Sequence, residues 1–155
     1  MSSFTANASP VVLQRPITAG PFWPEVDVAA LRDAVRVPGD VTAPRVRGAA
    51  VMAFIAVTRE LTAWKDKVEA AGHLTLADVP APHVDGVSVL QQLFLRAVHC
   101  ATAVELHERY RSYDATAQGN QRADELTPTI DELRRDHRSA VRDLLGIDRV
   151  TVELI

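Results

Sequence analysis

Residues 43–72 read APRVRGAAVMAFIAVTRELTAWKDKVEAAG. Apolar residues recur in this stretch at steps of three and four, the spacing that places side chains on one face of an α-helix. These residues are Val46, Ala50, Ala53, Val57, Leu61, Trp64, Val68 and Ala71. Thr42 can cap the start of a helix, Pro44 is tolerated in its first turn, and Gly72 is a common stop. The pattern therefore predicts one long helix over residues 43–71.

Two shorter patterns flank this helix. Asp27 can cap a short helix over residues 27–36. Ser88 and Gln91 form a capping-box pattern at the start of a helix over residues 88–113. Within the long helix, the segment 51–57 is apolar on nearly every face. Other helices or another subunit are therefore expected to enclose that segment.

A fourth helix is predicted over residues 127–145. Thr127 is its candidate N-cap, Pro128 suits the first position, and Gly146 follows its end. Its inward residues are expected to be Ile130, Leu133, Val141 and Leu144. Its many charged residues, between 131 and 143, fit either a solvated helix face or a polar interface between subunits. The main core contacts are expected from Leu61, Trp64, Phe94 and Leu133.

The two ends of the chain differ from the middle. Residues 1–24 contain four prolines and are predicted to form an extended arm, which Phe22 and Trp23 pin to the core. Residues 25–147 are expected to be the helical bundle domain. The fold class is therefore predicted to be all-α, a bundle of about four main helices between extended ends.

Residues 148–155 are predicted to be a strand-like tail. Apolar and polar residues alternate there, as in a strand with one apolar face. A lone strand leaves its N–H and C=O groups without partners, so we expect the tail either to pair with another protein or to fray in water. The apolar composition favours docking on a partner. The docking residues would be Val150, Val152, Leu154 and Ile155.

Composition limits the possible functions. The formal net charge of −3 gives no electrostatic basis for binding DNA or an anionic membrane. No apolar run reaches the ~18 residues of a membrane span, and the first residues do not look like a signal peptide. The single cysteine, Cys100, lies among apolar residues and is interpreted as a buried structural residue.

A search for catalytic or metal-binding patterns finds none. No Glu-x-x-His pair is present, and no glycine-rich phosphate loop or Gly-x-Ser-x-Gly occurs. His99 and His107 lie eight residues apart, roughly 80° around a helix, so they are not expected to share a face. His99 and Cys100 diverge by ~100° and do not form a nucleophile–base pair. We therefore expect no enzymatic activity, no cofactor and no metal.

Several stretches resemble the head completion protein (protein L) family of peduovirus-type, P-two-like, contractile-tailed phages. They occur in order over about residues 22–155. The clearest is TIDELRRD at 129–136. The others are FWPEVD at 22–27, LADVPA at 76–81 leading to DG at 85–86, RAV at 96–98 with Cys100, ERYR at 108–111 with DA at 114–115, and AD at 123–124.

The resemblance implies a helical, non-enzymatic virion protein at the head–tail neck, which would be in the host cytoplasm during assembly. Such a protein docks on the phage portal protein after DNA packaging and helps to retain the DNA. Its expected partners are the portal, other copies of itself in a closed ring of about twelve, and neck or tail-terminator proteins. Packaged DNA would pass nearby without sequence-specific binding, and no membrane is involved. The alternative is a cytosolic bacterial helical-bundle enzyme or ligand-binding regulator.

Overall fold

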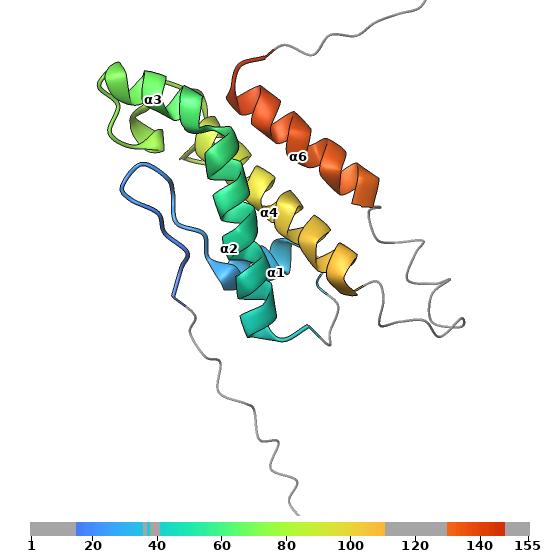
Figure 1. The fold of residues 1–155 in the computed structure, drawn as a ribbon. Coiled ribbons are helices and arrows are strands. Elements are labelled where there is room, and N and C mark those ends of the chain that lie inside the picture. The colour runs from blue at the N-terminus through green and yellow to red at the C-terminus, as the bar shows by residue number, and fades with distance from the viewer. Residues whose placement is uncertain (1–14, 36, 38–40, 111–129, 148–155) are drawn as a thin grey trace, which may run out of the picture.

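The computed structural model describes residues 15–35, 37, 41–110 and 130–147. The described part is mostly helical, which confirms the predicted all-α class. Helix α4 packs against both α2 and α6, and α1 lies beside α2 (Figure 1). The elements are α1 (Val28–Ala34), α2 (Ala43–Glu60), α3 (Thr62–Ala70), the short 3₁₀ helix η1 (Leu76–Asp78), β1 (His83–Val84), β2 (Val87–Ser88), α4 (Val89–Tyr110) and α6 (Ile130–Leu144).

The single helix predicted over 43–71 is wrong at Leu61, where the chain divides into α2 and α3. Leu61 has φ −90° and ψ 0°, outside the helical range. On either side of it, Thr58 donates its hydroxyl to the carbonyl of Phe54 at 2.9 Å and Thr62 donates to Thr58 at 3.0 Å. Such hydroxyl-to-backbone bonds commonly bend helices. Helix α3 consequently leaves α2 at an angle (Figure 1).

The segment before α1 is packed onto the helices. Ile17 and Val26 exchange two backbone hydrogen bonds of 2.9 Å, closing a turn that carries Phe22 and Trp23. Both aromatic side chains are buried, which confirms that they pin this segment to the core. Asp27 then caps α1 as predicted, because its carboxylate accepts the Ala29 N–H at 2.7 Å.

An aromatic cluster lies at the centre of the core. Phe94 is fully buried, stacks on Trp23 with ring centroids 4.8 Å apart, and meets Phe54 edge to face at 5.6 Å. Phe22 packs edge to face against Trp23 and against Trp64. The cluster thus joins the N-terminal segment to α2, α3 and α4. Leu61 is fully buried as expected, whereas Trp64 and Leu133 are only half-buried against the core.

The start of α4 differs from the prediction. Ser88 forms no capping box, since its hydroxyl is buried and has no hydrogen-bond partner among the residues that the structure describes. Instead, the Val89 N–H donates to the carbonyl of Pro82 at 2.9 Å. Gln92 donates to the Val84 carbonyl at 2.6 Å and so fixes the small β1–β2 hairpin to the helix.

A capping box does occur earlier, between α3 and the β1–β2 hairpin. The Thr75 hydroxyl accepts the Asp78 N–H, and the Asp78 carboxylate accepts the Thr75 N–H at 2.9 Å, which starts η1. The sequence carries the matching Thr-x-x-Asp pattern at residues 75–78. Capping is a local property, so this element could have been predicted.

Helix α6 ends as the sequence predicts. Gly146 has φ 68°, and the N–H of Ile147 bonds to the carbonyl of Arg142 at 3.0 Å, as in a glycine-terminated helix. Val141 and Leu144 are buried, and Leu133 is half-buried. Residues 127–129, where the helix was expected to begin, lie outside the described residues.

Candidate functional site

A partly open groove of about 460 Å³ lies between the end of α1, one face of α4 and the first half of α6. Its apolar lining comes from all three elements. The apolar residues are Ala34, Val35, Leu95, Cys100, Ala103 and Leu133. Gln92, Arg96, His99, His107 and Asp136 complete the lining. The size is within the range of protein sites that bind small ligands or side chains.

His99 and His107 both line this groove, so the expectation that they would not share a face is wrong. The groove is bounded by three helices and accepts side chains from more than one row of α4. Burial lowers the pKa of His99 and the pKa of His107 below the ordinary value of 6.5. Both imidazoles are therefore neutral near pH 7, and the charged side chains of the lining are Arg96 and Asp136, which pair with each other.

Cys100 is buried, as the sequence interpretation held. Burial raises the pKa of its thiol, and the nearby Asp136 carboxylate raises it further, while Arg96 acts in the opposite direction. The uncharged thiol is consequently the form present near pH 7. A thiol in this state is a weak nucleophile, so this position behaves as a small apolar residue.

Polar contacts join α4 and α6 along the edge of the groove. Arg96 pairs with Asp136 at 3.2 Å, and Arg134 pairs with Glu108. Part of the charged face of α6 therefore forms ion pairs with α4 of the same chain. The sequence predicted only a solvated face or an interface between subunits. Asp131, which is 90% exposed, pairs with Arg134 at 3.3 Å.

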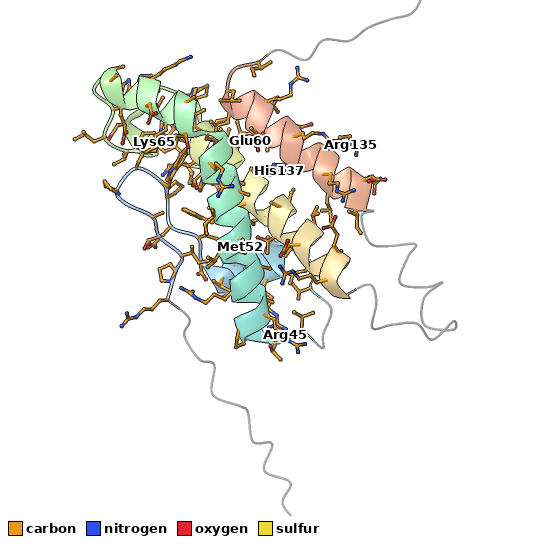
Figure 2. The ribbon with its side chains drawn as sticks, viewed as in Figure 1. Arg45, Met52, Glu60, Lys65, Arg135 and His137 are labelled. Atoms are coloured by element: carbon orange, nitrogen blue, oxygen red, sulfur yellow. The ribbon has the colours of Figure 1, made fainter. Side chains whose placement is uncertain are left out.

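The outer face of α2 is not enclosed by the described chain. Met52 is 54% exposed and Ile55 is 42% exposed. Figure 2 labels Met52 on this outer side of the helix. Ala53, Phe54 and Val57 are buried within the chain, so helices of the same subunit enclose only one side of this segment. Enclosure of the outer side by another subunit stays a prediction.

The described residues contain no group of three His, Cys, Asp or Glu side chains arranged to hold a metal ion. Within the same residues, no helix combines the length and apolar character needed to cross a membrane. The predicted docking residues Val150, Val152, Leu154 and Ile155 lie outside the part of the chain that the structure describes.

Comparison with known proteins supplies the functional class. The family described as "Phage head completion protein (GPL)" matches residues 17–155. The head completion/stabilization protein of Escherichia phage P2 is 38% identical over 134 residues, which cover 86% of this chain and 79% of that protein. No solved structure matches the chain. These findings define a structural protein of a phage head. The chain belongs to the phage head completion protein (GPL) family.

Proposed function

We propose that this protein docks on the portal vertex after DNA packaging, helps to retain the DNA, and prepares the head for joining to the neck or tail. The observation that carries the proposal is the family match over residues 17–155. The similar P2 protein is described as acting in head completion and stabilization. Family membership favours this structural role over a cytosolic enzyme or ligand-binding regulator.

The proposed partners are the portal protein, neck or tail-terminator proteins, and other copies of the chain in a closed ring of about twelve. The Cys100 thiol is buried and uncharged near pH 7, so it is a weak nucleophile, which fits a protein without catalytic activity. The net charge of −3 fits a protein that packaged DNA passes without sequence-specific binding. Assembly would take place in the host cytoplasm, and the final location would be the neck of the virion.

Within this function, residues 148–155 serve as the docking tail that contacts the portal or an adjacent copy. The alternation of Val150, Val152 and Leu154 with polar residues supports this role, because extended segments bind by backbone pairing and by alternate side chains. Ile155 extends the apolar character of the segment.

Deletion of residues 149–155 tests the proposal. The truncated protein should show the helical circular dichroism and cooperative unfolding of the full chain, but it should fail to load onto packaged heads. A matched control replaces Thr151 and Glu153, the polar residues of the same segment, by Ala and should load normally. Normal loading of the truncated protein would show that the tail is not the docking element. Electron microscopy of virions that places the protein away from the vertex would contradict the function itself.

A further inference from the structure

We propose that the groove between α1, α4 and α6 is the receptor for residues 150–155 of an adjacent copy of this chain. The inference rests on the proposed function, which gives the tail a docking role without naming the surface that receives it. It adds a specific acceptor, built from Val35, Leu95 and Leu133, and places that acceptor on the same protein.

The groove and the tail agree in length. The lining residues along α4 extend from Gln92 to His107. At about 1.5 Å per helical residue these positions lie roughly 22 Å apart along the axis. An extended chain rises about 3.3 Å per residue, so residues 150–155 span roughly 20 Å. Val150, Val152 and Leu154 would project from one side of that segment toward the groove.

The groove and the tail also agree in polarity. The lining presents aliphatic carbons from three helices, and the two histidines within it are uncharged near pH 7 because burial lowers the pKa of each. At the rim, Arg96 is 61% exposed and already close to Asp136. Glu153 lies on the polar side of the tail, opposite the residues that would enter the groove, so it would face solvent rather than the apolar lining.

The other parts of the chain outside the described structure fit the groove less well. Residues 111–129 contain only two large apolar or aromatic residues, Tyr113 and Leu126. The apolar residues 11–13 lie within four positions of Arg15, whose carbonyl is bonded by Arg47 of α2. No residue of α2 lines the groove. The C-terminal segment is the best match in composition.

The proposed ring of copies favours insertion of each tail into the groove of a neighbouring copy over insertion into the chain's own groove. Each copy would supply one donor tail and one acceptor groove, so every interface would join two different surfaces. Interfaces of this heterologous kind close into a ring when the rotation between copies is right. Insertion of each tail into its own groove would leave the copies without this link.

Disulfide trapping in assembled virions tests the proposal. The chain has a single cysteine, so a Cys100→Ser background leaves no other thiol in it. In that background, His99→Cys places a thiol in the groove and Val152→Cys places one in the tail. After mild oxidation, a non-reducing gel should show a ladder of covalently linked chains and a loss of the single-chain band. The matched control pairs Val152→Cys with Arg59→Cys, an exposed position on α2 outside the groove, and should give no ladder.

The remaining outcomes are separable. Single chains without free thiols would mean that the tail enters its own groove, and this would overturn the exchange. If both cysteines keep free thiols in virions that carry the variant, the groove is not the receptor for the tail. Docking of the tail on the portal would still be consistent with that result. If the His99→Cys variant fails to load, Gln92→Cys at the end of the groove takes its place. Normal loading of the chain truncated after residue 148 would instead show that the tail is not the docking element. Electron microscopy that places the protein away from the vertex would contradict the proposed function itself.

Discussion

His137 on α6 lies 3.3 Å from Glu60 on α2, measured from the imidazole Nε2 to the carboxylate oxygen. The other ring nitrogen, Nδ1, lies 3.1 Å from the carbonyl oxygen of Ala97 on α4. Figure 2 shows His137 between the helices beside Glu60, whereas Arg135 points away from them. One side chain therefore connects three helices that are distant in the sequence.

Replacement of His137 by Ala should lower the free energy of unfolding by about 1–2 kcal/mol, because both polar contacts and the half-buried ring are lost. The Glu60 carboxylate is 48% exposed, so solvent weakens its share of the effect. Urea unfolding followed by circular dichroism measures the change. Arg135→Ala, which removes an exposed side chain from the same helix, should change stability by less than about 0.5 kcal/mol. Equal losses in the two variants would contradict the structural role of His137.

Phe94→Ala should cost about 3–5 kcal/mol, since it removes a fully buried ring from the centre of the aromatic cluster. Tryptophan fluorescence should shift as well, because Trp23 stacks on Phe94. Leu74 is 73% exposed and serves as the control, for which Leu74→Ala should leave the unfolding midpoint nearly unchanged. A loss below about 1 kcal/mol for Phe94→Ala would show that the cluster is not the core.

Ser88→Ala should be neutral or stabilising, since a buried hydroxyl without a described partner costs about 1–3 kcal/mol. Thr75→Ala should instead destabilise by about 1 kcal/mol, because it removes the hydroxyl that caps η1. Thermal unfolding of both variants measures the contrast. If Ser88→Ala instead lowered the stability by about 1 kcal/mol, the result would support the capping box that the sequence predicts at the start of α4.

Stability should fall as the pH drops below about 6.5, because burial lowers the pKa of His99 and the pKa of His107 in the folded state. The unfolded chain then binds more protons than the folded chain, so the free energy of unfolding decreases on acidification. Above the unfolded pKa this contribution is fully present. Thermal unfolding between pH 7.5 and pH 5.5 checks the slope. The double variant His99→Asn/His107→Asn should have a shallower slope, and an unchanged slope would contradict the assignment.

Cys100 should react slowly with iodoacetamide at pH 8, because its thiol is buried and burial raises its pKa. Alkylation in the native protein should be at least about tenfold slower than in urea. Mass spectrometry of quenched samples gives the rates. A cysteine placed at the exposed Arg59, in a Cys100→Ser background, provides the reference for an accessible thiol.

Much of the helical structure could be read from short patterns. The N-cap at Asp27, the stop at Gly146 and the buried positions Val46 and Val57 all agree with the sequence. Capping and helical periodicity depend on hydrogen bonds and side chains within a few residues of one another, which is why a single stretch is sufficient. The family resemblance was likewise carried by short ordered stretches, and TIDELRRD at 129–136 was the clearest of them.

The break at Leu61, the role of Gln92 and the groove required the tertiary structure. Leu61 continues the apolar stripe, so the pattern gives no sign that α2 ends there. The helical pattern gives Gln92 no special role, because its hydrogen bond to the Val84 carbonyl depends on the hairpin that packs beside α4. The groove brings Val35, His107 and Leu133 together from three separate elements. Residues so far apart meet only when the helices pack, and packing angles depend on many contacts at once, so periodicity along one helix does not specify them.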